Sequence, residues 1–323
     1  MKNMIQAALV VMMLVSCETE QELKPLARHV VVIGVDGMSP DGIARAETPN
    51  LDYFIENGAS TMTARAVLPT SSSPNWASMI MGAGPEQHGI TSNGWEREND
   101  PMPPAVTGVE NIFPSIFSVL KIQQPEAKSA VIYHWGGFGR LFEKSAVSFS
   151  QHGEDQFVTT QIATEQIKKN QPRLTFVHLD HVDHAGHEYG HGTDHYYTSV
   201  EEADSLIGVI REAVEEAGML DETVFLITSD HGGLNYGHGG ESLAEIQIPF
   251  ILCGTGIKKN YEIPESVYTY DNAATVAYLL GLERPQAWIG RPVLSAVEGN
   301  EYDDPFTFEP PAMAKVPAPE IHP

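Results

Sequence analysis

An aspartate and a histidine stand side by side where an apolar segment of the chain ends. Residues 223–228 (Thr-Val-Phe-Leu-Ile-Thr) are followed by Ser229, Asp230, His231 and Gly232. The apolar run predicts a buried strand, and the glycine after it lets the backbone turn so that both side chains can face one point. A neutral imidazole beside a carboxylate is a ligand pair that Zn²⁺ accepts. The junction therefore predicts part of a metal site at a strand end.

The same residue types recur at the ends of other predicted strands and in a nearby glycine-rich loop. Together they supply three carboxylates and three imidazoles, which suffice for two metal ions with open coordination positions. Two such ions can stabilise both the attacking and the leaving oxygen in a displacement at phosphorus. The full set is Asp36, Asp183, His187, Asp230, His231 and His238.

A hydroxyl cluster offers a nucleophile for this chemistry. Ser71, Ser72 and Ser73 precede Pro74 and a predicted helix at residues 76–81. A serine at a helix N-terminus would place an attached phosphoryl group against free backbone N–H groups. Serines at this position also cap helices, and the local sequence taken alone favours capping.

These candidate residues need a scaffold, and the chain alternates apolar runs with helical segments. Strands are predicted at residues 29–36, 130–133, 174–178, 224–227 and 250–252. Helices are predicted near 49–57, 112–121, 157–169, 198–217 and 272–280, with a long surface loop at 93–114. This pattern predicts an α/β fold with a mostly parallel central sheet and helices on both faces. Such sheets bind ligands outside the carboxyl ends of their strands.

Charge limits the classes of partner. The 323 residues include 19 Lys+Arg against 43 Asp+Glu, for a formal net charge of −24. This balance argues against a nucleic-acid partner, which needs a cationic surface. An anionic small-molecule substrate would need a local positive centre, which a bound metal ion can supply.

The N-terminus has the features of an export signal. Residues 1–16 are expected to form a signal peptide, and Cys17 follows a small residue as in a bacterial lipobox. We expect a lipid anchor on Cys17 and a tether at 17–28, in an outer-membrane lipoprotein of a Gram-negative cell envelope. Only Cys253 then remains, so no intrachain disulfide is expected. One catalytic domain is predicted at 29–302, followed by a proline-rich tail at 303–323, extended or disordered.

The motifs, taken in order, resemble the alkaline phosphatase superfamily, most closely its nucleotide pyrophosphatase/phosphodiesterase branch. They are Val-Asp36-Gly, Ser72-x-Pro-Asn, Gly-x-x-Pro-x-x-His88-Gly-Ile, Asn93, Asp183-x-x-Gly-His187, Ser-Asp230-His231-Gly and the late His238-Gly. The resemblance extends from Val30 to about residue 290. It implies an alkaline-phosphatase-like fold and two Zn²⁺ ions, with other divalent metals possible.

Residue roles follow from this resemblance. One zinc would be held by Asp36, Ser72, Asp230 and His231, and the other by Asp183, His187 and His238. Ser72 would be the nucleophile and pass through a phosphoserine intermediate. Asn93 would contact a phosphate oxygen, together with backbone amides near Ser72 and Ser73. The expected substrate is a small phosphate ester or a nucleotide-like molecule.

Two departures from the family pattern matter. The branch usually has threonine as its nucleophile, and Ser72 stands here between two other serines. Either hydroxyl can act on zinc, so the chemistry survives the exchange. The interval from His231 to His238 is also short, so the insertion that often shapes the substrate pocket is missing. Substrate specificity therefore does not carry over.

Other polar and aromatic residues near the motifs receive weaker assignments. For the remaining histidines of the dense series we expect hydrogen bonding to metal ligands, substrate contacts or surface positions. Asp180 could compete with Asp183 as a ligand but fits the motif worse, and Asp204 is expected to be structural. An aromatic group beside Gly136 could stack a leaving group but is more often packing. The histidines are His178, His181, His184, His191 and His195, and the aromatic residues are Tyr133, Trp135 and Phe138.

The sequence thus predicts a zinc-dependent phosphodiesterase or nucleotide pyrophosphatase, with three alternatives. A phosphomonoesterase would need an added cationic group, which Arg65, Arg97 or Arg140 could supply. A sulfatase is disfavoured because Trp76 stands where the Cys/Ser-x-Pro-x-Arg frame needs arginine. A non-catalytic surface lipoprotein is disfavoured because every expected ligand is present.

Overall fold

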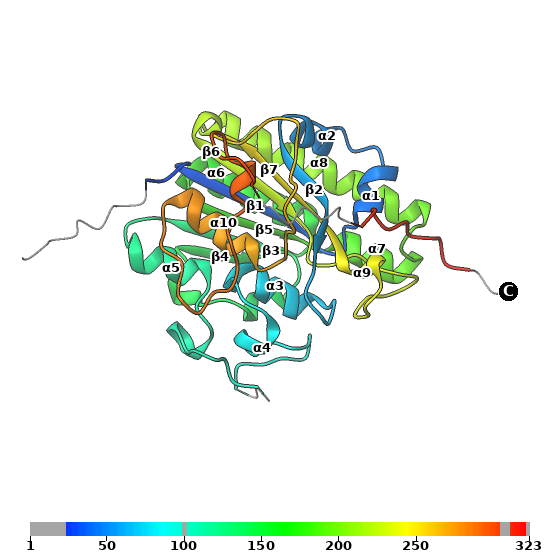
Figure 1. Cartoon of the computed structure of the whole chain (residues 1–323), viewed down its shortest axis with the longest axis horizontal. Coiled ribbons are helices and arrows are strands. Elements are labelled where there is room, and N and C mark those ends of the chain that lie inside the picture. Colours follow the sequence, from blue (N-terminus) through cyan, green and yellow to red (C-terminus); the bar gives the residue numbers. More distant parts are fainter. Residues whose placement is uncertain (1–23, 99–101, 304–310, 321–323) are drawn as a thin grey trace, which may run out of the picture.

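A twisted eight-stranded sheet forms the centre of the protein in the computed structural model, which describes residues 24–98, 102–303 and 311–320 (Figure 1). The strand order is β4-β3-β5-β1-β6-β7-β2-β8. The first five strands in this order run parallel, whereas β7 is antiparallel to both β6 and β2. The fold is therefore α/β with a mostly parallel sheet, as predicted. The strands are β1 His29–Val35, β2 Gly58–Arg65, β3 Ser129–Tyr133, β4 Phe149–His152, β5 Leu174–Leu179, β6 Thr223–Thr228, β7 Gln247–Gly254 and β8 Tyr261–Glu262.

Helices cover both faces of this sheet, because alternate residues of the central strands feed two separate cores. Val30 and Val32 of β1 belong to the core under α3, α5 and α10, whereas Val31 and Ile33 belong to the core under α1, α2, α6 and α8. Strands buried on both faces need continuous apolar runs, as β1 and β6 have. The helices are α1 Pro40–Arg45, α2 Pro49–Glu56, α3 Ser72–Met81, α4 Pro85–His88, α5 Ile116–Gln123, α6 Gln156–Asn170, α7 His181–Tyr189, α8 Asp194–Glu216, α9 Leu243–Ile246 and α10 Asp271–Leu280.

Several boundaries differ from the sequence-based prediction, and three strands were not predicted. Helix α5 begins at Ile116 because the Ser115 side chain accepts from two amides of its first turn, four residues after the predicted start. Helix α8 begins four residues early, where Thr193 caps it. The unpredicted strands are β2, β4 and β8; β2 has the sequence Gly-Ala-Ser-Thr-Met-Thr-Ala-Arg, which lacks an apolar run.

The described part of the C-terminal tail has neither helix nor strand, but it packs on the body of the protein. Gln247 donates to the carbonyl of Ala312 and accepts from the amide of Ala314 at 2.6 Å. Val316 is buried, and a Cβ built at Gly190 would lie 2.5 Å from Pro319 Cγ. The tail therefore runs past the end of α7 (Figure 1).

The predicted signal segment and Cys17 lie outside the described residues. Within the described ranges, no helix combines the length and the apolar character needed to cross a membrane.

Candidate active site

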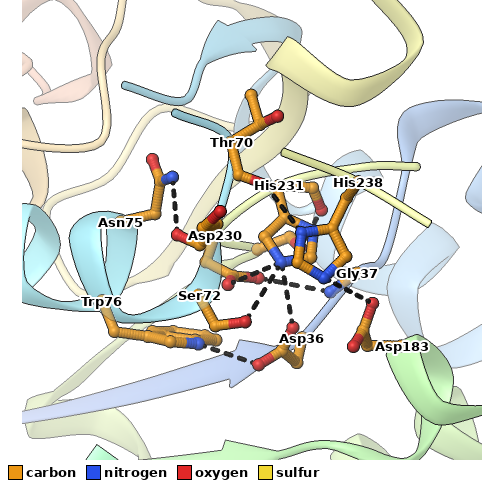
Figure 2. A network of polar contacts seen from close by, with 12 residues as sticks. Asp36, Gly37, Thr70, Ser72, Asn75, Trp76, Asp183, Asp230, His231 and His238 are labelled. Atoms are coloured by element: carbon orange, nitrogen blue, oxygen red, sulfur yellow. Dashed lines mark hydrogen bonds and ion pairs between the residues drawn. The ribbon is translucent and has the colours of Figure 1, made fainter. Parts of the chain in front are cut away.

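Three neighbouring strands bring the predicted metal ligands to one edge of the sheet. Strand β1 lies between β5 and β6 and runs parallel to both, so their carboxyl ends meet. Asp36 directly follows β1, Asp230 and His231 follow β6, and α7 with Asp183 follows β5. Figure 2 shows these side chains converging from the three strand ends. This is the position at which open α/β sheets bind ligands.

The first group of side chains surrounds His231. Its Nε2 lies 3.4 Å from Asp36 Oδ1 and 3.2 Å from Asp230 Oδ2. All three side chains are at most 1% exposed. Asp36 Oδ1 and Asp230 Oδ2 are buried and accept no hydrogen bond. Two buried carboxylate oxygens left without a donor beside a ring nitrogen form a set that a cation can complete.

Ser72 is the serine of the hydroxyl cluster that faces this group. Its Oγ lies 3.4 Å from His231 Nε2, whereas Ser73 Oγ is buried without a hydrogen bond. Ser71 occupies the N-cap position of α3, but its side chain makes no capping hydrogen bond. The capping role that the local sequence favoured is therefore wrong. The geometry also separates Ser72 from its two neighbours, which the sequence without the family resemblance could not do.

Asn93 lies next to Ser72 and is held in place by the first turn of α3. The amide of Ser73 donates to Asn93 Oδ1 at 2.7 Å, and Asn93 Nδ2 lies 3.5 Å from Ser72 Oγ. The Ser73 amide, expected to bind a phosphate oxygen, instead fixes which end of the Asn93 amide faces the serine. Asn93 Nδ2 is thereby left as a donor beside the Ser72 hydroxyl.

The second group of side chains is centred on Asp183. His238 Nε2 lies 3.7 Å from Asp183 Oδ1, and His187 Nε2 lies 3.3 Å from Asp183 Oδ2. The His238 ring stacks on that of His231 with 3.7 Å between centroids. Ligand atoms of Asp183, His231 and His238 all lie within 4.8 Å of one another, so the two groups share one continuous centre. Asp183 Oδ1 is again buried and without a donor.

The hydrogen bonds of the three histidines make their Nε2 atoms available as ligands. Each Nδ1 lies 2.8 Å from a backbone carbonyl: that of Gly232 for His231, Thr70 for His238 and Tyr236 for His187. A carbonyl only accepts, so each Nδ1 carries a proton, and a neutral ring then has a free lone pair on Nε2. A lone pair facing a carboxylate oxygen is repulsive unless a cation lies between them. The donor set therefore fits divalent metal ions.

The pKa values of the buried carboxyl groups show that their ionisation is unfavourable without a cation. Burial, and then the charge of Asp183, raise the pKa of Asp36 to about 7. Burial and the charges of Asp36 and Asp183 raise the pKa of Asp230 well above its usual value. Burial lowers the pKa of His231 to about 3, so this ring is neutral. The protein thus concentrates carboxylates whose ionisation requires an additional positive charge.

Asp183 and His187 behave differently, because a proton can take the cation's place between them. The hydrogen bond with Asp183 raises the pKa of His187 to about 9 despite partial burial. Burial alone would raise the pKa of Asp183, but the hydrogen bond from His187 lowers it. A metal ion bound here would have to displace the His187 proton.

A third group, Asp36, His178 and Asp180, also has close ligand atoms but is better explained by hydrogen bonding. The amide of Trp135 donates to His178 Nδ1 at 3.5 Å, so the ring proton is on Nε2, 3.3 Å from Asp36 Oδ2. Trp76 Nε1 donates to the same oxygen at 2.9 Å. His178 thus hydrogen-bonds to Asp36, a predicted metal ligand. The contribution of Trp76 was missed, because an indole nitrogen gives no sequence signal until its partner is known.

Two of the three arginines considered as phosphate ligands, Arg97 and Arg140, form ion pairs and hydrogen bonds with other parts of the protein. Arg97 donates to the carbonyls of Arg140 and Phe142 and pairs with Glu110 at 2.6 Å. Arg140 pairs with Glu96 and donates to the carbonyl of Asn93 at 3.0 Å. These two guanidinium groups hold the Asn93 loop. Arg65 lies at the end of β2.

Phe138 and Asp204, two further side chains considered near the motifs, both have structural roles. Phe138 is fully buried and stacks on Phe176 at 5.0 Å, so it is a packing residue. Asp204 is structural as predicted: it accepts from the amides of Asn50 and Leu51 at the start of α2.

A family model described as Type I phosphodiesterase / nucleotide pyrophosphatase matches residues 30–238. The chain belongs to this family. Its place in the alkaline phosphatase superfamily, which the ordered motifs predicted, is thereby confirmed. The matched range begins at β1 and ends at His238, so it spans all six predicted Asp and His ligands.

Curated relatives are similar at low identity. GPI ethanolamine phosphate transferase 1 of Candida glabrata is 23% identical over 86% of this chain and 34% of its own length. Bis(5'-adenosyl)-triphosphatase enpp4 of Mus musculus is 26% identical over 64% of this chain and 47% of its own length. The chain thus spans about a third to a half of these relatives.

Solved structures share the fold. Human ectonucleotide pyrophosphatase / phosphodiesterase 5 has a TM-score of 0.71 and 15% identity, covering 84% of this chain and 100% of that one. A 2-O GAG sulfatase has a TM-score of 0.69 and 14% identity, covering 85% and 75%. Likeness at this identity shows the fold alone.

Proposed function

We propose that this protein is a two-metal phosphoric-ester hydrolase that cleaves phosphodiesters or nucleotide pyrophosphate bonds through a phosphoserine on Ser72. The observation that carries the proposal is the position of Ser72 Oγ, 3.4 Å from His231 Nε2, beside the donor-free oxygens of Asp36 and Asp230. A hydroxyl at the edge of such a ligand set is placed to be ionised by the cation that the set would hold. Family membership supports the reaction class.

The residues divide into two metal-holding sets in this proposal. Asp36, Asp230 and His231 would hold one ion with Ser72, and the Asp183 group with His187 and His238 would hold the other. Zn²⁺ suits the nitrogen and carboxylate ligands. When bound, the ions neutralise phosphate charge and favour the ionised form of the serine and of the leaving group.

Side chains of the protein then position the nucleophile and the phosphate for the reaction. Ser72 Oγ forms a bond to phosphorus while the bond to the leaving oxygen breaks, and water later cleaves the serine–phosphorus bond. Asn93 Nδ2, fixed by the Ser73 amide, donates to a non-bridging oxygen beside Ser72. Asp36 and His231 keep their ligand atoms near Ser72 throughout, because both are buried.

A diester or pyrophosphate is favoured over a monoester on electrostatic grounds. A monoester dianion needs an extra cationic donor, but two of the three candidate arginines, Arg97 and Arg140, are engaged with Glu110, Glu96 and backbone carbonyls. One solved neighbour, murine ectonucleotide pyrophosphatase / phosphodiesterase 5, holds AMP in its structure, which supports a nucleotide-like substrate here.

A sulfatase function is disfavoured although sulfatases share the fold. Trp76 takes the place of the arginine that their motif requires, and its ring nitrogen donates to Asp36.

Hydrolysis is tested with matched serine variants. We expect Ser72→Ala to lower kcat on bis(p-nitrophenyl) phosphate by at least about a thousandfold, as nucleophile removal does elsewhere. Ser71→Ala and Ser73→Ala should stay within about tenfold of the wild-type protein. Mass spectrometry of protein that is acid-quenched during turnover should find a p-nitrophenyl phosphoryl group on Ser72. Elemental analysis should find two metal ions per chain. Full activity in Ser72→Ala, or an active protein without metal, would refute the proposal.

Two further assays distinguish the substrate class and the acceptor. Turnover of p-nitrophenyl phosphate should be well below that of a nucleoside monophosphate p-nitrophenyl ester; the reverse would indicate a monoesterase. Three relatives are named as ethanolamine phosphate transferases, which favours an alcohol acceptor as the second candidate. If a dilute alcohol is used in preference to water, so that the transfer product exceeds the hydrolysis product, the protein is a transferase.

A further inference from the structure

Thr70 joins the segment that leads to Ser72 with the loop that carries His238. Its carbonyl accepts from His238 Nδ1 at 2.8 Å. Its hydroxyl accepts from the amide of Gly239 at 3.0 Å and donates to the carbonyl of Gly240 at 2.7 Å. Thr70 is fully buried, and Figure 2 shows it beside the His238 ring. One residue thus makes three hydrogen bonds to three consecutive residues.

The Thr70 side of this junction is firmly held. Asn75 Nδ2 lies 3.1 Å from the carbonyl of Pro69 and 3.0 Å from that of Ser71, on either side of Thr70. Asn75 is itself fully buried in the first turn of α3. The position of Thr70 is therefore fixed relative to Ser72, two residues further along.

The His238 side is held at its two ends, where Gly237 pairs with Leu234 and Gly240 bonds to Glu245. The loop contains Gly237, Gly239 and Gly240, and Gly239 has a φ of +107°, a conformation that glycine adopts readily. A Cβ built at Gly237 would meet nothing within 4 Å. Glu245 accepts from the amide of Gly240 at 2.7 Å and anchors the far end of the loop. Between Gly237 and Gly240, the bonds to Thr70 hold the backbone that carries His238, whose ring also stacks on that of His231.

We propose that the Thr70 hydroxyl is a positioning group that sets the metal affinity of the Asp183–His238 group and fixes its distance from Ser72. The bonds to Gly239 and Gly240 hold the loop so that His238 Nδ1 meets the Thr70 carbonyl and Nε2 faces Asp183 Oδ1. Loss of the hydroxyl frees the loop, whereas Asp36, Asp230 and His231 keep their own hydrogen bonds to Trp76, Gly37 and Gly232. The inference rests on the metal-dependent function proposed above.

The test measures metal binding without turnover. Metal-free protein is titrated with Zn²⁺ against a chromophoric chelator, for the wild type, Thr70→Val and Thr70→Ser. We expect Thr70→Val to weaken one of the two binding events by about tenfold or more, as loss of a group that orients a ligand does elsewhere. The other event should change by less than about threefold, and Thr70→Ser, which keeps the hydroxyl, should restore both.

Thr275→Val is a matched control. Its hydroxyl also donates to a carbonyl, that of Asp271 at 2.8 Å, and accepts from an amide, that of Val293 at 3.1 Å. It is buried like Thr70 but lies on α10 and contacts no metal ligand. We expect this variant to lower the melting temperature while leaving both Zn²⁺ affinities unchanged. If Thr70→Val does not fold, Thr70→Ala removes the hydroxyl without adding a methyl group in its place.

Three results would overturn the inference: unchanged affinities without the hydroxyl, an equal loss of both, or failure of serine to restore them. Because binding is measured directly, the inference can fail while Ser72-dependent hydrolysis stands. It can also survive in a protein that binds two metals but proves not to hydrolyse diesters.

Discussion

The two oxygens of Asp36 have opposite surroundings. Oδ2 receives hydrogen bonds from Trp76 Nε1 and His178 Nε2, whereas Oδ1 has no donor and faces His231. The two donors prevent the carboxylate from rotating, so a single oxygen is presented to the metal position. Fixing a ligand through its second atom is a common way to tune metal affinity.

Trp76→Phe tests this arrangement, since it keeps the aromatic packing and removes the N–H donor. We expect about tenfold weaker binding of one Zn²⁺ in the chelator competition, together with a comparable loss of diesterase activity at limiting metal. Trp288→Phe is the control, because that indole is also buried but donates to the carbonyl of Pro114. Equal effects of the two substitutions would contradict a specific role for Trp76.

At this scale, the sequence revealed residue types but not their partners. Asp36, Asp230 and His231 could be predicted because carboxylates and imidazoles at strand ends have few structural uses. Ser72 could be separated from Ser71 and Ser73 only by resemblance, since all three are small and adjacent. Thr70 and Trp76 could not be predicted, because their contacts join residues up to 170 positions apart.

The start of helix α2 depends on a side chain from another helix. Thr48, its N-cap, makes no capping hydrogen bond; instead Asp204 of α8 accepts from the amides of Asn50 and Leu51, at 3.2 and 2.7 Å. Asp204 also accepts from Asn50 Nδ2. A single buried carboxylate thus fixes the packing of α2 against α8 and supplies acceptors for N–H groups that the helix cannot satisfy itself.

Asp204→Ala should therefore destabilise the fold without changing the chemistry. We expect a loss of about 1–3 kcal/mol in the free energy of unfolding by urea, because buried amides lose their acceptor. Activity per folded molecule should be unchanged, and Asp204→Asn, which keeps one oxygen, should lose less. An unfolding free energy equal to that of the wild type would show that water replaces the carboxylate.

Element prediction succeeded where burial on both sheet faces required long apolar runs. Strands β1 and β6 are examples, since every residue in them is buried. Strand β2 was missed because its polar threonines and serine are stabilised by pairing with β7, a partner almost 200 residues away in sequence. Such pairing leaves no local periodicity, so an element of this kind becomes visible only in three dimensions.

On the scale of the whole molecule, the fold buries carboxylates that only a cation can stabilise in ionised form. The pKa of Asp36 is raised from 3.8 to about 7 in the metal-free fold, and the pKa of Asp230 is also raised well above its ordinary value. Between pH 3.8 and about 7, Asp36 of the folded protein retains a proton that the unfolded chain has released. The free energy of unfolding of the metal-free protein therefore falls as pH rises through this window.

Metal removal should consequently lower the melting temperature more at about pH 8 than at about pH 5. His187 acts in the same direction: Asp183 raises its pKa to about 9, and that stabilisation is lost as pH rises through this value. Scanning calorimetry with and without a chelator, at both pH values, checks the prediction. A chelator effect that is equal or larger at the lower pH would contradict it.

The packed tail has a practical consequence for anyone who purifies this protein. Pro319 lies against Gly190, one residue beyond the helix that carries Asp183 and His187, and close to Tyr236. A polyhistidine tag fused shortly after Pro319 would be tethered close to that position, and its imidazoles would compete for the ions that the site is proposed to bind. Metal stoichiometry and affinity should therefore be determined with the tag cleaved off.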